Sequence, residues 1–228
     1  MRKLILILSM VVAFASAEAQ TYVKSNGKYV KIKGKYVVGQ KVVAPSYDPD
    51  FLAFWARTTG TPDSWKDAYN QLFVDLKAAG LYSKMDALYI FAAHNESDAR
   101  INLIANTYNC TAHNSPIFTQ KSGFSTTASG YLNTHFKAKE NVGQYSLNSA
   151  TAMVILETQT VNTGLKCSFG TIYGGQQYAV VQRISGTIYW GVNASAYSTT
   201  SNTANISGVV AVTRGNSSSM NIFITGVT

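Results

Sequence analysis

The residues best suited to acid–base chemistry are two carboxylates at alternate positions, Glu96 and Asp98. Alternate residues of a strand share one face. Retaining glycosidases hold two carboxyl groups about 5–5.5 Å apart, as nucleophile and as acid/base. No third acid follows, because the next residues are Ala99, Arg100 and Ile101. We therefore predict a polar loop in which Arg100 neutralises the two acids, and no catalytic residue.

Other chemical signals are weaker. His94, Glu96 and Asp98 could bind a divalent ion together, but three such ligands in a polar loop occur often by chance, so we expect no metal and no cofactor. His113 and His135 stand alone and are expected as hydrogen-bonded surface or boundary residues. The sequence contains no Gly-x-Ser-x-Gly elbow, no P-loop and no dinucleotide fingerprint after a strand.

Aromatic residues near glycine-, serine- and asparagine-rich turns indicate a binding role. Exposed rings can stack on sugars while neighbouring amides bond the hydroxyl groups. The alternative is that many of these rings fill a core or pair across strands. The candidate ligand-binding residues are Tyr173, Tyr178, Tyr189, Trp190 and Tyr197.

The net charge of +8 is concentrated near the N-terminus. Six lysines and no acid lie in residues 21–44, whereas from Pro45 onward 11 basic residues face 10 acidic ones. Such an arm could bind acidic polysaccharide, lipopolysaccharide or another anionic partner. It could also be a solvated edge that prevents sheet aggregation. Nucleic-acid binding is not expected from this charge alone. The six residues are Lys24, Lys28, Lys31, Lys33, Lys35 and Lys41.

The only two cysteines are Cys110 and Cys167. In an exported chain they could form one disulfide, closing a loop of about 57 residues and contributing about 4 kcal/mol. They could equally be two buried thiols that pack as small hydrophobic residues. Both alternatives stay open.

Residues 1–19 are typical of a cleaved signal peptide. Arg2 and Lys3 precede an apolar run over 4–14, and two small-x-small cleavage patterns follow at 15–17 and 17–19. The run is too short to cross a bilayer. We expect a secreted, periplasmic or cell-surface protein with no transmembrane segment after signal removal.

The pattern of apolar, polar and turn residues divides the chain into four segments. After the signal peptide, residues 20–44 predict a basic β-hairpin arm, with Asn26-Gly27 as a type I′ turn. Residues 45–86 predict a proline-containing linker through Asp50, a short helix or strand over 51–56, and an amphipathic helix over 64–79 that packs against the β-sandwich. Its apolar stripe consists of Trp65, Tyr69, Leu72, Phe73 and Leu76.

Residues 87–228 predict an antiparallel β-sandwich, so the fold class is mainly β. Short strand patterns separated by turn residues, with no helical period between them, favour a sandwich or barrel. The expected strands cover 88–92, 100–105, 116–119, 131–136, 150–157, 165–173, 177–183, 187–193, 206–213 and 219–225.

Several segments resemble a phage and prophage tail-type protein family. They read DLKAAGLYSKMDALYIFAAH at 75–94, ARINL at 99–103, AHNSPIFT at 112–119, GF at 123–124 and SGYLNT at 129–134. The resemblance is best over 65–136. It implies a concanavalin A-like (laminin-G-like) jelly-roll sandwich and a virion or surface-binding role, and it supplies no catalytic residues. A signal peptide is unexpected in that family. Related chains continue with further strands, which leaves open a C-terminally incomplete sandwich.

We therefore expect a non-enzymatic extracellular or virion-type attachment or structural protein that binds a glycan or another surface ligand. One alternative is a secreted carbohydrate-active enzyme on the same fold. The other is a structural subunit that assembles by strand addition, as a homo-oligomer or with a partner, through its N-terminal arm.

Overall fold

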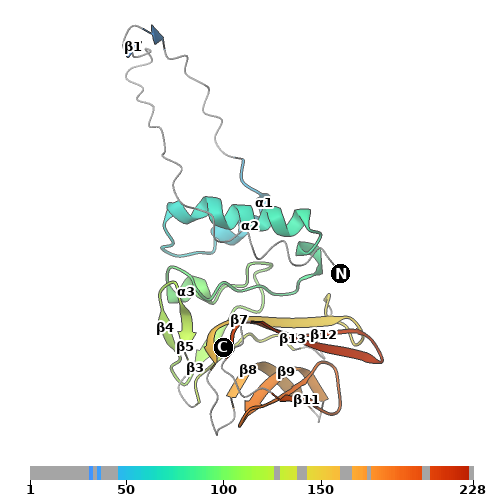
Figure 1. Ribbon diagram of the computed structural model, residues 1–228. Coiled ribbons are helices and arrows are strands. Elements are labelled where there is room, and N and C mark those ends of the chain that lie inside the picture. Colours follow the sequence, from blue (N-terminus) through green and yellow to red (C-terminus); the bar gives the residue numbers. More distant parts are fainter. Residues whose placement is uncertain are drawn as a thin grey trace. The chain divides into compact units, whose positions relative to one another are not determined.

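The computed structural model describes residues 31–32, 35–36, 46–125, 129–137, 143–159, 166–173, 176–201 and 206–225. They belong to two compact units, Met1–Ser46 and Tyr47–Thr228. The protein is mainly β, and its strands pair antiparallel throughout the described residues (Figure 1).

The described residues of the first unit form one short strand pair. Strand β1 (Lys31–Ile32) lies antiparallel to β2 (Lys35–Tyr36), with Lys31 opposite Tyr36. The expected signal peptide, the Asn26-Gly27 turn and four of the six arm lysines lie outside the described residues.

The second unit begins with a helix that starts inside the predicted linker and covers most of the segment 51–56, for which a short helix or strand was expected. Helix α1 spans Pro49–Trp55, and Asp48 caps it by accepting hydrogen bonds from the amides of Asp50 and Phe51. Proline fits the first position of a helix, because its missing N–H would have no partner there. The linker predicted through Asp50 therefore ends at Asp48, and Pro49 initiates a helix.

Helix α2 (Lys66–Ala78), preceded by the 3₁₀ turn η1 (Asp63–Trp65), occupies the segment with the predicted apolar stripe. Tyr69 and Phe73 are buried, and they pack against Phe51 and Phe54 of α1. Among the described residues, the buried partners of α2 come from α1 and the following segment up to Leu103. The prediction that this helix packs against the sandwich is therefore wrong. Its aromatic stripe meets the aromatic face of α1 instead.

The strands predicted over 88–92 and 100–105 are not formed. This part of the chain contains only the short helices η2 (Tyr82–Lys84) and α3 (Glu96–Ala99). The run 88–92 has the composition of a strand, but Leu88 is held by other contacts: its amide donates to the Asn102 side chain at 3.0 Å, and its carbonyl oxygen accepts from the Leu103 amide at 2.8 Å.

Asn102 is the centre of these hydrogen bonds and is fully buried. Its side-chain oxygen accepts from the amides of Leu88 (3.0 Å) and Ile104 (3.1 Å). Its side-chain nitrogen donates to the carbonyl oxygens of Asp86 (3.2 Å) and Thr107 (3.0 Å). All four hydrogen-bonding positions of the amide are thus used, and three stretches of chain are held together.

Two small sheets follow. Strand β3 (Thr111–His113) pairs with β6 (Tyr131–Asn133), and β4 (Ile117–Thr119) pairs with β5 (Gly123–Ser125). The strand expected over 131–136 ends at Asn133, because His135 adopts a left-handed backbone conformation with φ of 57°.

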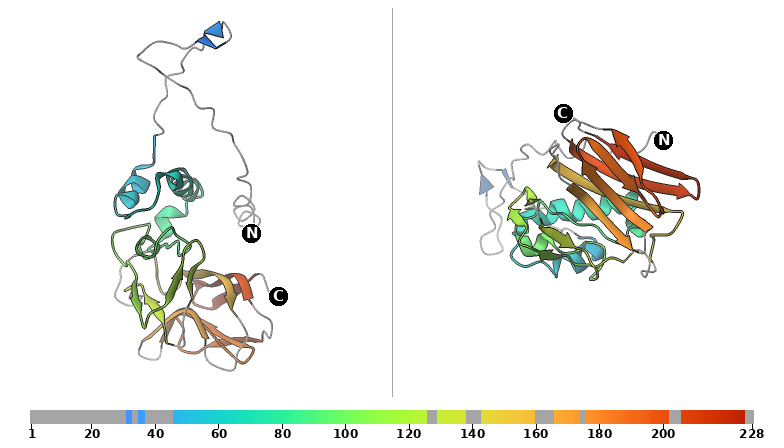
Figure 2. Two further views of the ribbon diagram at one scale, coloured as in Figure 1. Left: turned by 90° about the vertical axis from the view of Figure 1, so that its left-hand side faces the viewer. Right: turned by 90° about the horizontal axis from the view of Figure 1, so that it is seen from below.

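Two larger sheets lie face to face (Figure 2). One has the strand order β11-β10-β9-β8 and the other β13-β12-β7. Their inner faces share one core, to which Val181 and Ile188 contribute from the first sheet and Val210 and Val212 from the second. The strands are β7 (Ala150–Gln159), β8 (Lys166–Tyr173), β9 (Gln176–Ile184), β10 (Thr187–Gly191), β11 (Ser198–Ser201), β12 (Ile206–Asn216) and β13 (Ser219–Ile224).

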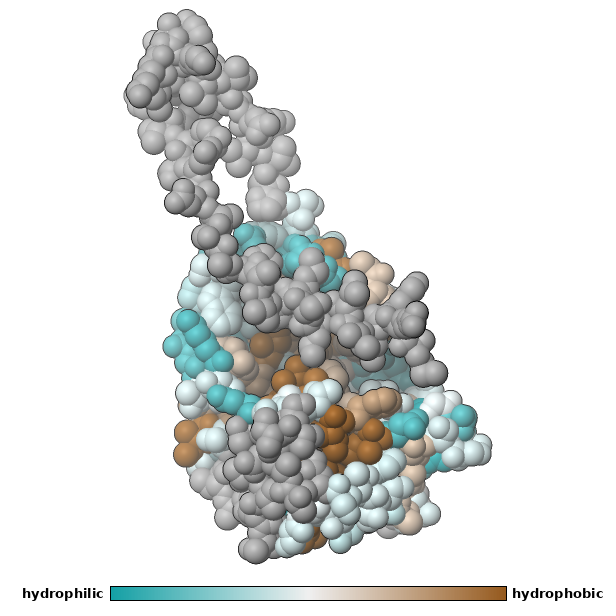
Figure 3. All heavy atoms as spheres, viewed as in Figure 1, coloured by the Kyte–Doolittle hydropathy of each residue, from teal (hydrophilic) through white to brown (hydrophobic). Residues whose placement is uncertain are grey.

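The outer face of the three-stranded sheet carries an apolar row. Ala211 lies opposite both Met153 and Phe223, and these two side chains are 58% and 55% exposed. Hydrophobic residues also gather in the middle of the molecular face that Figure 3 shows.

The carboxylate of Asp86 connects the irregular segment to the chain that leads into β7. It accepts hydrogen bonds from the amides of Gln144 and Tyr145, both at 2.8 Å. A Cβ atom on Gly143 would lie 2.0 Å from an Asp86 carboxylate oxygen. Glycine is therefore needed at position 143 for this contact.

Cys110 and Cys167 are both free thiols, but only Cys110 is buried as the alternative of two buried thiols expected. Burial raises the pKa of the Cys110 thiol to about 11, so this residue is an unreactive packing group near neutral pH. Cys167 is exposed, and its sulfur donates to the carbonyl oxygen of Phe169 at 3.1 Å.

Replacing Asn102 with alanine should lower the free energy of unfolding by about 3 kcal/mol or more, because several buried backbone groups would lose their partners. Urea unfolding of the full chain measures the change. Asn106→Ala is the matched control, since Asn106 is an exposed asparagine of the same segment, and it should change stability by no more than about 0.5 kcal/mol. Equal effects of the two variants would contradict the central role of Asn102.

Candidate functional site

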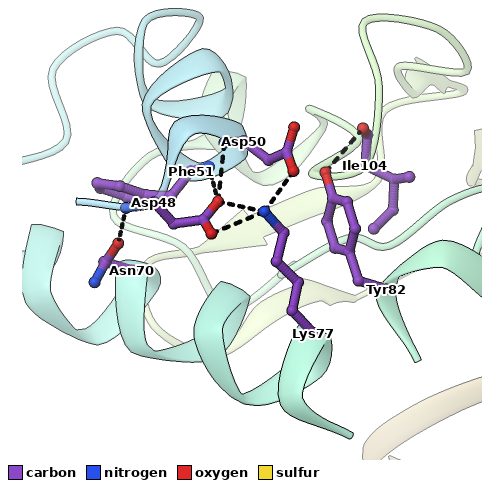
Figure 4. Close-up of polar contacts among 7 residues, drawn as sticks. All are labelled: Asp48, Asp50, Phe51, Asn70, Lys77, Tyr82 and Ile104. Atoms are coloured by element: carbon purple, nitrogen blue, oxygen red, sulfur yellow. Dashed lines mark hydrogen bonds and ion pairs between the residues drawn. The ribbon is translucent and has the colours of Figure 1, made fainter. Parts of the chain in front are cut away.

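The densest cluster of charged groups joins α1 to α2 (Figure 4). The Lys77 ammonium lies 2.7 Å and 2.8 Å from the two carboxylate oxygens of Asp48 and 2.5 Å from Asp50. The Asp48 amide donates to the Asn70 side chain at 2.7 Å, and Lys77 lies 5.1 Å from the centre of the Tyr82 ring. Each carboxylate already faces a cation, so we interpret the cluster as a structural brace.

Acid–base chemistry at this brace is further disfavoured by its electrostatics. Burial by itself would raise the pKa of Asp48, but the hydrogen bonds from Lys77 and from the amides of Phe51 and Asp50 lower it below its ordinary value. The hydrogen bonds that the Lys77 ammonium donates to Asp48 and Asp50 raise its pKa. Both groups are therefore held in their charged forms, as an ion pair requires and as a proton-transfer catalyst near neutral pH does not.

Glu96 and Asp98, the two acids considered for catalysis from the sequence, do not face one another. Asp98 is buried and accepts hydrogen bonds from the Thr59 amide (2.7 Å), the Thr61 hydroxyl and the Asn95 side chain (2.9 Å). Glu96 faces Arg100 at 3.8 Å. Arg100 thus neutralises Glu96, as the polar-loop interpretation expects, while Asp98 anchors the loop that precedes α2.

His94 does not join these acids in a metal site. Its ring nitrogen Nδ1 lies 3.1 Å from the Gln120 side chain, and its ring lies edge-on to Trp65. No group of three or more His, Cys, Asp or Glu side chains suited to a metal occurs within the described part of the chain. None of the helices described there is long and apolar enough to cross a membrane.

The five aromatic candidates have different environments. Trp190 is 9% exposed and belongs to the sandwich core, where its indole N–H donates to the Thr200 hydroxyl at 3.1 Å. It is therefore a core residue. The backbones of Tyr173 and Tyr178 belong to β8 and β9, and their side chains lie outside the described set.

Tyr197 is half-buried and lines an open hollow of about 470 Å³. Its ring meets that of Tyr189 edge-on, with centroids 6.1 Å apart. The wall of the hollow comes from the loop between β10 and β11 and from the β12–β13 hairpin. Its lining residues are Asn193, Ala194, Ser195, Ala196, Tyr197, Ser198, Arg214 and Met220.

Arg214 holds the base of this hollow. Its guanidinium donates to the carbonyl oxygens of Val192 (3.2 Å) and Asn193 (2.5 Å) on one side. On the other side it donates to those of Asn216 (3.1 Å) and Ser217 (2.7 Å). One residue thus joins the loop to the hairpin through four backbone contacts.

Asn193 makes further contacts at the same end of the loop. It is buried and has a positive φ of 51°. Its side chain donates to the carbonyl oxygens of Ser146 and Leu147 and accepts from the Tyr145 hydroxyl at 3.0 Å. The residues that line the hollow therefore sit on a loop anchored at Asn193 and Arg214. Neither anchor was identified from the sequence, because only the fold shows which carbonyl groups they contact.

The hollow combines one aromatic ring, two serine hydroxyls and a guanidinium. No acidic residue follows Glu157 in the sequence, whereas Lys166, Arg183 and Arg214 do. An aromatic ring beside hydroxyl groups can bind a polar small molecule by stacking and hydrogen bonding.

Two histidines expected to stand alone share one partner. The Thr111 hydroxyl lies 3.2 Å from Nε2 of His113 and 2.9 Å from Nε2 of His135. Thr111 and His113 are alternate residues of β3, so a shared face could have been predicted for them. The approach of His135 depends on the pairing of β3 with β6, which the sequence does not show.

No family model, no curated protein and no solved structure matches this chain.

Replacing Asp48 with asparagine should lower the stability at pH 7 by about 1 kcal/mol, because the ion pairs with Lys77 are partly exposed. The folded-state pKa of Asp48 lies below its ordinary value, so its contribution is present above the unfolded pKa and is lost as the pH falls through the folded pKa. Wild type should therefore lose more stability than Asp48→Asn between pH 6 and about pH 3.

Urea unfolding at each pH measures this difference. Asp75→Asn removes an exposed carboxylate from the same region and should keep the pH dependence of wild type. If the free energy of unfolding changed with pH in the same way for wild type and for Asp48→Asn, protonation of Asp48 would not affect stability.

Proposed function

We propose that this protein is a non-enzymatic attachment protein that binds a glycan or similar polar surface ligand in the hollow beside Tyr197. The observation that carries the proposal is the composition of that hollow. The Tyr197 ring offers a stacking surface, and Ser195 and Ser198 offer hydroxyl groups. Asn193 and Arg214 hold the loop in place, so little order has to be gained when a ligand binds.

Binding is favoured over catalysis by the use of the acidic side chains. Hydrolysis of a glycosidic bond needs two carboxyl groups facing one substrate. Asp48 and Asp50 face Lys77. Asp86 and Asp98 bind amide and hydroxyl groups of the chain. A secreted carbohydrate-active enzyme remains the alternative.

The assignment to a specific type of sandwich and to an attachment role rests on the sequence resemblance. We propose that the two packed sheets are a concanavalin A-like jelly roll and that the protein serves as a secreted, cell-surface or virion-type attachment module. The lysine arm, which includes Lys31 and Lys35 of the β1–β2 pair, would contact acidic polysaccharide or another anionic surface. Assembly through that arm by strand addition is the corresponding structural role.

The hollow is tested by screening the full chain on a glycan array and measuring the affinity for the best ligand. Tyr197→Ala should weaken binding about tenfold, or about 1.4 kcal/mol, because the stacking surface is lost. Tyr197→Phe keeps the ring and should bind within about threefold of wild type, a difference of less than about 1 kcal/mol.

Tyr131→Ala is the matched control, because Tyr131 is also a surface tyrosine, 49% exposed, and does not line the hollow. It should bind as wild type does. Equal binding by wild type and Tyr197→Ala would place the ligand elsewhere. Release of reducing sugar from the bound glycan would favour the enzyme alternative.

A further inference from the structure

Two imidazole rings converge on one point at the surface, well outside the Tyr197 hollow's lining. Both Nε2 atoms, of His113 and His135, lie within hydrogen-bond distance of the Thr111 hydroxyl oxygen. They are therefore no more than about 6.1 Å apart. A hydroxyl has one proton, so it can donate to only one of the two rings and must accept from the other.

The convergence is built by the fold around it. His113 stacks on Tyr131, its cross-strand neighbour, with ring centroids 4.8 Å apart and an interplanar angle of 8°. The amide of His135 donates to the Asn133 side chain at 2.8 Å, and its φ of 57° turns the chain at the end of β6. Thr111 lies opposite Asn133 in the β3–β6 pair. Three local interactions thus direct the two rings toward the same hydroxyl.

We propose that Thr111, His113 and His135 form a surface site for a late first-row divalent metal ion, such as Cu²⁺ or Zn²⁺. Both rings bind the ion through Nε2, with their protons on Nδ1. The Thr111 hydroxyl oxygen then completes the coordination together with water, because a nitrogen that binds the ion can no longer form a hydrogen bond with the hydroxyl.

The choice of metal follows from the ligands. Imidazole nitrogen suits copper, zinc and nickel, whereas magnesium and calcium prefer oxygen ligands. Each Zn–N bond is about 2.0–2.1 Å long, so the two nitrogens must approach each other when an ion binds. His135 is exposed, and its ring can close this distance without disturbing a core.

The test is calorimetric titration of the full chain, produced without a histidine tag, with ZnCl₂ and with CuCl₂. The exposed thiol of Cys167 is first removed as Cys167→Ser in every protein tested, since thiolates also bind these metals. We expect saturable binding in this background. His113→Ala and His135→Ala should each abolish it, and Thr111→Val should weaken it about tenfold.

His94→Ala is the matched control, because His94 is the third histidine of the chain and contacts Gln120 and Trp65 instead. It should bind the ion as the background protein does. NMR spectra of the protein with all three histidines intact give a second test. Substoichiometric Cu²⁺ should broaden the ring proton signals of His113 and His135 more than those of His94. Lack of saturable binding, binding that survives both histidine variants, or broadening centred on His94 would overturn the proposal.

Discussion

Buried backbone amides and carbonyl groups must find partners, and between Met85 and Cys110 no strand supplies them. The fully buried side chain of Asn102 meets this requirement by bonding to four different residues. Arg57 adds hydrogen bonds to the carbonyl oxygens of Asn102 (2.9 Å) and Ala105 (3.0 Å). Since β3 follows directly at Thr111, the position of the small β3–β6 sheet depends on this network.

The same requirement explains the positions of three acidic residues. Asp48, Asp86 and Asp98 each accept hydrogen bonds from backbone amides, and each joins segments that are distant in sequence. Their charges connect segments of the chain. The two candidate ligand surfaces are built from neutral polar, aromatic and basic side chains. The Tyr197 hollow and the pair of histidines on Thr111 are both of this kind.

The sequence predictions were most accurate for strands in which the alternation of apolar and polar residues agrees with the observed burial. β7, β12 and β13 lie at the predicted strands 150–157, 206–213 and 219–225, because Val210 and Val212 alternate with outward residues. The prediction failed over 88–92, an apolar run in which the Leu88 amide donates to the Asn102 side chain and not to a neighbouring strand. It also missed β11 (Ser198–Ser201), whose serines and threonines carry no hydrophobic pattern. Trp190 could be assigned to the surface or the core only once the partner sheet was known. Tertiary contacts decide such positions, and local propensity does not.

The strand order of the three-stranded sheet sets a sequence of folding events. Strands β8 to β11 form a chain of neighbouring hairpins, and such local contacts form early. β7 must instead pair with β12, so that Ala150 meets Arg214 across the whole of the other sheet's sequence. Closing so long a loop costs conformational entropy, which is compensated only after β7 and β12 have made contact. During synthesis β7 therefore leaves the ribosome well before its partner. Until β12 arrives, both faces of β7 are open to water, including Met153 on the face that remains exposed afterwards.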